Sequence, residues 1–185
     1  LDRRLSDHFT VLFEGAAEQP LADRVLHILE LAFWRVGMSL SAYPAETVTV
    51  VLYTEQQFRD ITRAPGWAAG SFDGTIRVPV RGALERPGEL ERVLAHELTH
   101  ALVWSLAPRG VPTWLNEGLA VVFEGENLDW ARRQLQAARD RFALAHLHAP
   151  FSTLTTEQAA GAYAESGLAA QALLDLIGGV GVTNL

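Results

Sequence analysis

Two histidines lie four residues apart, with a glutamate directly after the first, in the segment His96-Glu97-Leu98-Thr99-His100. In a helix, both imidazoles project from nearly the same face, about 6 Å apart along the axis, and can bind one metal ion. Glu97 is rotated about 100° from His96, so it lies beside the ion and outside its ligand set. There it can hold and deprotonate a water molecule. The spacing predicts a metal site with its own general base.

A zinc ion needs a third protein ligand, and the sequence limits where that ligand lies. The metzincin pattern requires Gly at position 103 and His at position 106, where this chain has Val103 and Leu106, so that class is excluded. The remaining common option is a Glu from the next helix, and Glu117 follows the proline-bounded turn 108–112 at a suitable distance. The alternative interpretation of Glu117 is a surface carboxylate near a helix N-terminus, where the helix dipole favours negative charge.

The hydrophobic pattern predicts the elements that position these residues. Period-two alternation and β-branched residues predict strands over 8–13, 47–53 and 75–80, and Pro79 suggests an edge position for the last. Helical spacing predicts helices over 21–38, 55–61, 86–107, 114–124, 129–147 and 157–177, with Thr113 as an N-cap and Gly178 ending the last helix. Apolar residues around the two histidines predict a largely buried helix, where a polar cluster must be paired or coordinated.

These elements predict an α+β fold class. We expect one domain over 1–185, with a small mixed sheet in an N-terminal lobe of about 1–85. A helical lobe of about 86–185 follows and carries the helix with the two histidines.

Composition narrows the classes of function. The chain has 185 residues, 49% of them hydrophobic, and no cysteine, which excludes disulfides, thiol nucleophiles and cysteine-based zinc sites. Any metal must therefore be held by His and carboxylates. A net charge of −7, with arginine as the one basic residue type, argues against nucleic acid as a partner. No run approaches the roughly 20 apolar residues of a membrane span, and the start at Leu1 leads us to expect a domain cut from a longer chain.

The segments VLAHELTHALV and VPTWLNEGLAVVFEG together resemble the gluzincin clan of zinc metallopeptidases, and more narrowly the peptidase MA-like domains. The second segment is also similar to the WLNEG segment of zinc aminopeptidases, and the runs 48–58 and 66–79 are similar to the same domains. The resemblance implies a zincin-like two-lobed fold with His96, His100 and Glu117 as zinc ligands and Glu97 as the general base. It also points to a tyrosine on a later helix that stabilises the oxyanion, and Tyr163 matches it.

The chain departs from the family pattern at two places. The thermolysin-like carboxylate one turn after the Glu ligand is replaced by Val121, and Glu124, two turns on, is a candidate to support a ligand histidine instead. The aminopeptidase GAMEN segment, which captures a free α-amine, is replaced by the residues 69–74. The absence of the GAMEN segment argues against exopeptidase action.

The sequence therefore predicts a zinc-dependent peptidase, an endopeptidase that hydrolyses extended peptide or protein substrates and adds them as a strand to the edge strand 75–79. The alternative is a non-catalytic peptide-binding or assembly module that keeps the zinc site for structure. A third interpretation is a plain α+β domain with a coincidental motif. The intact Glu97 favours the enzyme, because a structural zinc site has no use for a base beside an open coordination position.

Overall fold

The computed structural model describes residues 1–66, 68–80, 87–125, 127–138 and 142–185, and its described part is a mixed α+β fold. Five strands form one sheet in the order β1 (Asp2–Leu5), β2 (Phe9–Phe13), β3 (Val48–Tyr53), β5 (Ile76–Pro79) and β4 (Ser71–Phe72). The strands β2, β3 and β5 run parallel, and β1 and β4 pair antiparallel to their neighbours at the two edges. The expected small mixed sheet in the N-terminal half is therefore confirmed.

Six α-helices accompany the sheet within the described residues. They are α1 (Gln19–Leu40), α2 (Glu55–Thr62), α3 (Pro87–Leu106), α4 (Thr113–Phe123), α5 (Asp129–Ala137) and α6 (Thr156–Thr183). Three short 3₁₀ turns cover Ala16–Glu18, Leu144–His146 and Phe151–Thr153. All the described strands precede α3, so the second half of the chain is helical, as expected.

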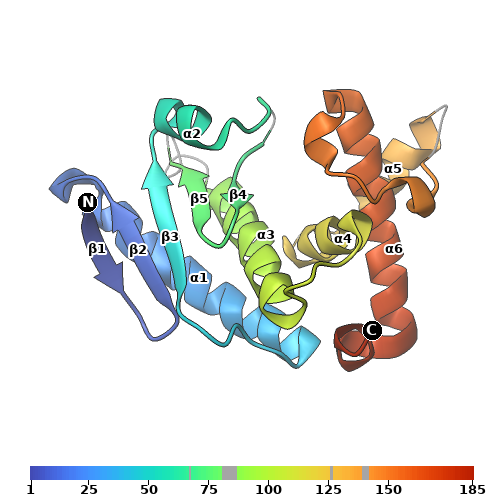
Figure 1. Ribbon diagram of the computed structural model, residues 1–185, viewed down its shortest axis with the longest axis horizontal. Helices are drawn as coiled ribbons and strands as arrows, with labels where there is room; N and C mark the ends of the chain where they lie inside the picture. Colours follow the sequence, from blue (N-terminus) through green and yellow to red (C-terminus); the bar gives the residue numbers. More distant parts are fainter. Residues whose placement is uncertain (67, 81–86, 126, 139–141) are drawn as a thin grey trace.

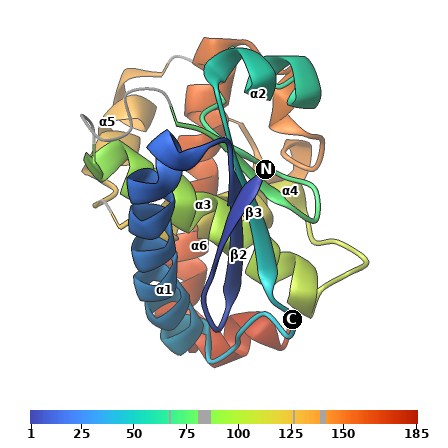
Figure 2. The same ribbon diagram turned by 90° about the vertical axis from the view of Figure 1, so that its left-hand side faces the viewer.

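One face of the sheet forms the larger core, with α1 and α3 packed against it (Figure 1 and Figure 2). The alternation predicted for residues 8–13 is confirmed in β2. Phe9, Val11 and Phe13 are buried, while Thr10 and Leu12 between them are half-buried. The strand β3 contributes Val50 and Leu52 to the same core. Burial of this period-two stripe fixes the register of the sheet, since a slip by one residue would expose it.

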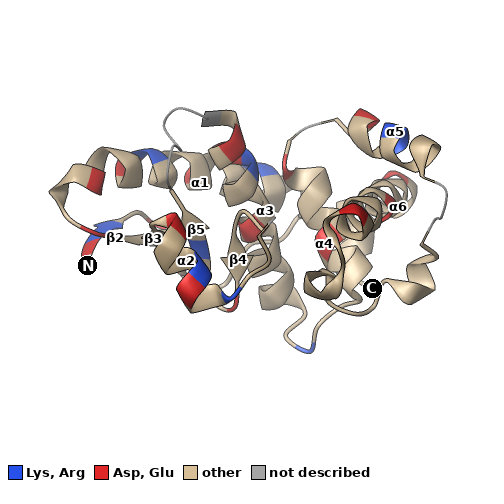
Figure 3. Cartoon of the chain, turned by 90° about the horizontal axis from the view of Figure 1, so that it is seen from above, with Lys and Arg blue, Asp and Glu red and all other residues tan. Residues whose placement is uncertain are grey.

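The helix α3 is shared between two cores. Its residues Leu94 and Leu98 are buried against the sheet, whereas Leu102 and Val103 join a second core with α4 and α6. Seen from above, α3 lies between the sheet with α1 and α2 on one side and α4, α5 and α6 on the other (Figure 3). A side chain on the α4-facing surface of α3 is therefore held between the two halves of the molecule.

The edge position predicted for the strand 75–80 is wrong. The strand β5 lies between β3 and β4, with Ile76 and Arg77 paired on both sides, and the short β4 is the edge strand. Pro79 is compatible with this position because it is the last residue of β5 and lies beyond the residues that pair with β4. Neither β4 nor β1, a polar segment without alternation, was predicted from the sequence.

Several helix boundaries also differ from the prediction. Thr113 is the first residue of α4 and Pro112 is the N-cap, and the Thr113 hydroxyl donates a hydrogen bond to the carbonyl of His148, at 2.7 Å. The predicted helix 129–147 ends at Ala137, while its residues 139–141 lie outside the described residues, as does the predicted start at Arg86. The break predicted at Gly178 is present, with φ of 70°, but α6 then continues to Thr183.

One helix among those described, α6, meets the length and composition expected of a membrane span, a criterion that core helices of soluble proteins also meet. Its residues Ala159, Ala162, Ala164 and Ala170 are buried. Ala162, Ala164 and Ala170 pack in the cores that α6 forms with α4, α5 and the turn at Phe151. Of the stretch of α6 that meets the criterion, 22% is buried, and Leu176 and Val180 of this helix are exposed.

Candidate metal centre

The helices α3 and α4 bring three potential ligand side chains together. His96 and His100 lie one turn apart on α3, on the surface opposite the residues that fill the sheet core, and Glu117 faces them from α4. The imidazole rings are edge-on to each other, with centroids 4.7 Å apart. One ligand atom from each of the three residues lies within 4.8 Å of the others.

The distances in this cluster suit a tetrahedral metal ion. Glu117 Oε2 lies 3.4 Å from His96 Nε2 and 3.5 Å from His100 Nε2. Ligand atoms placed about 2.1 Å from a tetrahedral zinc ion are about 3.4 Å apart, so both distances match. A charge-assisted hydrogen bond would be about 2.7–2.9 Å long, and Glu117 Oε2 has no hydrogen-bond partner among the described residues although it is buried. The distances between Glu117 and the two histidines therefore suit a shared metal ion better than a short direct hydrogen bond.

The other ring nitrogen of each histidine is occupied by an acceptor. His96 Nδ1 lies 2.8 Å from Glu124 Oε1, and His100 Nδ1 lies 3.0 Å from Asn116 Oδ1. Because both partners are acceptor oxygens, each Nδ1 carries a proton, so deprotonation of the ring at Nε2 frees that nitrogen to bind a metal ion. This tautomer is the one in which a histidine binds metal through Nε2. The predicted support of a ligand histidine by Glu124 is thus present in the structure.

Without a metal ion, the cluster strongly perturbs its own protonation. Burial disfavours the charged form of His96, but Glu117 and Glu124, which face its two ring nitrogens, outweigh burial and raise the pKa of His96 to about 10. Burial likewise opposes the charge on Glu117, yet the two histidines prevail and hold the pKa of Glu117 far below its usual value. Ligands must be deprotonated to bind metal, so a proton competes with the metal ion for His96 Nε2, whereas the Glu117 carboxylate is already ionised.

Glu97 lies next to the ligand cluster and is 5% exposed. Burial, the largest influence, raises the pKa of its carboxyl above 4.5, as expected for a base that works near neutral pH. Its Oε2 is buried without a hydrogen-bond partner in the described part of the chain. Gly70, just before β4, packs so closely on this carboxylate that a Cβ there would lie 2.6 Å from Glu97 Oε1.

Tyr163 lies beside the cluster although it belongs to α6, because α6 and α4 cross closely. A Cβ on Gly118, the residue after Glu117, would overlap the carbonyl oxygen of Ser166, so glycine allows the two helices to approach. The Tyr163 ring then packs 6.2 Å from His96 and 5.2 Å from Phe151, measured between ring centroids. Burial and the neighbouring carboxylates raise the pKa of the Tyr163 phenol, which keeps it protonated as a donor.

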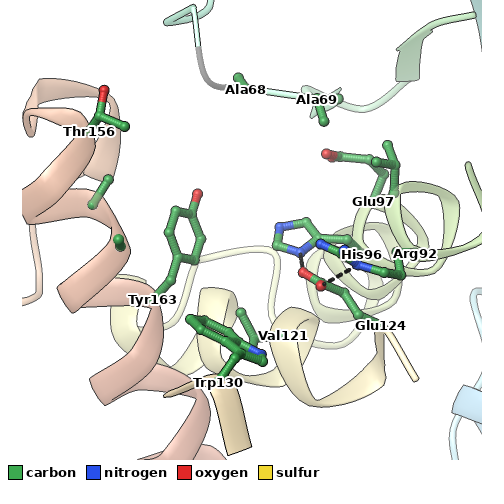
Figure 4. Close-up of a pocket in the computed structure, with 14 residues that line it drawn as sticks. Ala68, Ala69, Arg92, His96, Glu97, Val121, Glu124, Trp130, Thr156 and Tyr163 are labelled. Carbon is green, nitrogen blue, oxygen red and sulfur yellow. Dashed lines mark hydrogen bonds and ion pairs between the residues drawn. The ribbon is translucent and has the colours of Figure 1, made fainter. Parts of the chain in front are cut away.

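A cavity of about 350 Å³ opens beside the cluster. Figure 4 shows Tyr163 and Glu97 pointing into it from opposite sides, with His96 between them. Ala68, Ala69 and Gly70 from the segment that leads into β4 form another wall. The arrangement can therefore place a small molecule or a peptide segment against a base, a hydroxyl donor and a metal position together.

The structure brings together all five residues that the sequence selected, namely His96, Glu97, His100, Glu117 and Tyr163. Sequence reasoning missed three neighbours: Asn116 behind His100, Arg92 on Glu124, and Gly70 against Glu97. A signal existed for two of them, because Asn116 directly precedes Glu117 and Arg92 lies one helical turn before His96. Nothing in the local sequence marks Gly70, which is distant in the chain.

Comparisons of this chain with protein-family models, with curated protein sequences and with solved structures found no match.

Proposed function

We propose that this chain is a zinc-dependent peptidase that hydrolyses peptide bonds within extended chains. The observation that carries the proposal is the position of Glu97, a buried carboxylate whose Oε2 has no hydrogen-bond partner among the described residues, beside three side chains spaced to hold a zinc ion. His96, His100 and Glu117 would hold the zinc ion, which when bound would supply Lewis-acid polarisation and a water activated near neutral pH.

We assign the proton transfers, the stabilisation of the oxyanion and the orientation of the histidines to residues of this chain. Glu97 accepts the proton of the attacking water, and its raised pKa suits it to pass that proton to the leaving amine. Tyr163, kept protonated, donates a hydrogen bond to the carbonyl oxygen as negative charge develops there. Glu124 and Asn116 hold the two histidines in orientation.

An extended substrate is expected to enter along the segment 68–70. These residues line the cavity, and β4, which follows them directly, is the edge strand of the sheet. An edge strand presents unpaired backbone groups to which a peptide can add by main-chain hydrogen bonds. The substrate-binding edge proposed here is therefore β4 with its preceding segment, in place of the strand 75–79.

The second candidate is a non-catalytic peptide-binding or assembly module with a structural zinc ion. Structural zinc sites are closed by four protein ligands. In the part of the chain that the structure describes, three side chains converge on the metal position and a cavity opens beside them. This open position favours the enzyme.

Zinc analysis combined with cleavage of a diverse peptide mixture tests the proposal. We expect about one zinc per wild-type chain, loss of zinc in Glu117→Ala, and retained zinc without cleavage in Glu97→Gln. The matched control is Glu91→Gln, an exposed carboxylate on the same helix, which should keep both zinc and cleavage. A wild-type protein that binds no zinc would overturn both candidates. A zinc-loaded wild type that cleaves no peptide would favour the binding module.

A further inference from the structure

The last turns of α1, α3 and α6 meet at one end of the molecule, which is at the bottom of Figure 1 and Figure 2. Leu40 of α1, Leu102 of α3 and Val182 of α6 are buried together in the second core. The contact between α6 and α1 is close, because a Cβ on Gly179 would overlap the carbonyl oxygen of Ser39. Three segments that are distant in the chain therefore lie side by side at this end.

This end of the molecule is apolar and almost without charge. Arg109 is the one charged residue within the segments 36–45, 102–112 and 176–185, although 20% of the residues of the chain are charged. We call these three segments together the apolar end. Large hydrophobic side chains are exposed on each of them, namely Met38, Trp104, Leu106, Leu176, Ile177 and Val180. Apolar surface gathered in this way marks a site of interaction with a protein or a membrane.

The last part of α6 has the composition of a membrane-embedded segment. A stretch of α6 is apolar enough to cross a bilayer, and 22% of it is buried, whereas the core helix of a soluble protein is mostly buried. After Asp175 the helix has no charged residue, and at Gly178, with φ of 70°, it bends and lies across the end of the molecule (Figure 1). The earlier turns of α6 pack against α4 and α5, so a span would break these cores. The arrangement suits a position in the plane of the membrane interface.

Aromatic side chains border the apolar end. Trp104, in the last turn of α3, is exposed, and so is Trp34, which lies one turn before Met38 on the same face of α1. The ring of Tyr43, just after α1, packs 5.6 Å from the ring of Trp34, measured between centroids. Trp and Tyr favour the membrane–water interface, because each ring is apolar with one polar group. The rim of a protein interface is polar, so this aromatic border favours a bilayer over a protein partner.

The metal centre lies far from the apolar end. The residues of α6 that line the cavity, from Thr156 to Tyr163, belong to its first turns. The helix from Tyr163 to Leu176 spans about 20 Å at a rise of about 1.5 Å per residue. A bilayer against the apolar end would therefore leave the cavity open to water.

We propose that the apolar end binds the surface of a bilayer of zwitterionic phosphatidylcholine. Met38, Leu176 and Val180 enter the boundary between headgroups and acyl chains, and the aromatic rings stay at the level of the headgroups. The net charge of −7 disfavours anionic lipids, which attract clusters of Lys and Arg. None of these side chains lines the cavity, so membrane binding is independent of the proposed peptidase function.

Flotation of the protein with phosphatidylcholine vesicles tests the apolar end. Wild type should float with the vesicles. Leu176→Glu and Met38→Glu should each lower the partition coefficient at least about 10-fold, because burial of one such side chain changes a partition equilibrium by about that factor or more. Both side chains are exposed, so both variants should keep the wild-type melting temperature.

The matched control is Ile61→Glu, an exposed aliphatic position on α2 at the opposite end of the molecule (Figure 1), which should float as wild type does. A wild type that does not float would overturn the proposal. Equal flotation of wild type, Leu176→Glu and Met38→Glu would overturn it as well, and so would an equal loss in Ile61→Glu.

Two further measurements distinguish a phosphatidylcholine bilayer from other partners. Sedimentation velocity without lipid should give the same molecular mass for wild type and Leu176→Glu. A wild-type dimer that dissociates in Leu176→Glu would identify a second copy of the chain as the partner and overturn the proposal. Vesicles that also contain phosphatidylglycerol should bind wild type no more tightly than phosphatidylcholine alone, because the net charge is negative. Tighter binding to these vesicles that weakens with salt would show electrostatic attraction and overturn the proposal.

Discussion

Glu124 Oε1 lies 2.8 Å from His96 Nδ1, across the interface between α4 and α3. A carboxylate one turn after the Glu ligand would occupy position 121, but Val121 is buried there and packs against Gly167 of α6. The supporting carboxylate comes instead from the residue that follows the last turn of α4. Arg92, one turn before His96, contacts the second oxygen of Glu124 and fixes its orientation.

Removal of the Glu124 carboxylate is expected to weaken metal binding. A partner on the far nitrogen of a ligand histidine sets its tautomer and basicity, and its loss typically lowers metal affinity 10–100-fold. We therefore expect Glu124→Ala to lower zinc affinity by about 10-fold or more, measured by competition with a chromophoric chelator, and Glu91→Gln to match wild type. An unchanged affinity in Glu124→Ala would show that Glu124 does not support His96.

Zinc binding should release protons. In the metal-free protein the pKa of His96 is raised to about 10, so His96 carries a proton on both ring nitrogens at neutral pH, and the pKa of His100 is raised as well. A group with a raised pKa must lose its proton when the metal enters, and the apparent affinity falls as the pH falls. Calorimetric titrations at pH 7.5 in buffers of different ionisation enthalpy should report release of about one proton or more. Heats that do not depend on the buffer would contradict this expectation.

The contact between Gly70 and Glu97 should matter for turnover and not for metal binding. A methyl group at position 70 would displace the Glu97 carboxylate, because its Cβ would lie 2.6 Å from Oε1. A misplaced catalytic group can cost about 100-fold in rate, so Gly70→Ala should retain zinc but cleave peptides much more slowly. Gly66→Ala, in the same loop region with open space around it, is the control. Equal rates for the two variants would argue against Glu97 as the base.

The crossing of α4 and α6 should tolerate no side chain at Gly118. Alanine there would meet the Ser166 carbonyl and force the helices apart, at an expected cost of about 1–3 kcal/mol in the free energy of unfolding. The melting temperature should fall by at least about 2–4 °C for a chain of this size. Gly88→Ala, in the first turn of α3, should instead be neutral or stabilising, because a Cβ there would meet no atom of the described residues packed around the helix within 4 Å. A melting temperature unchanged in Gly118→Ala would show that the helices can separate freely.

Local spacing within single helices was sufficient to predict the central part of the site. The four-residue separation of His96 and His100 places them on one face in any helix, and their apolar flanks predict the buried surface on the other side. Period-two alternation predicted β2 in the same way, because burial of one face follows from the pattern itself. Glu117 was predicted from its distance along the chain from the two histidines, because the prolines between them force a turn that brings the next helix back beside the first.

Only the tertiary structure decided which distant residues complete the site. Asn116 and Gly70 act across helix and loop contacts that no local pattern specifies, and only packing decided that Glu124 contacts His96 and not His100. The edge strand was predicted wrongly for the same reason. The pairing of β4 with β5 depends on where the loop between them returns the chain, and the composition of neither strand specifies that. The sequence by itself determined the ligand types and their spacing through helix geometry. The packing of α3 between the sheet and α4 determined their orientation, their supporting partners and the cavity beside them.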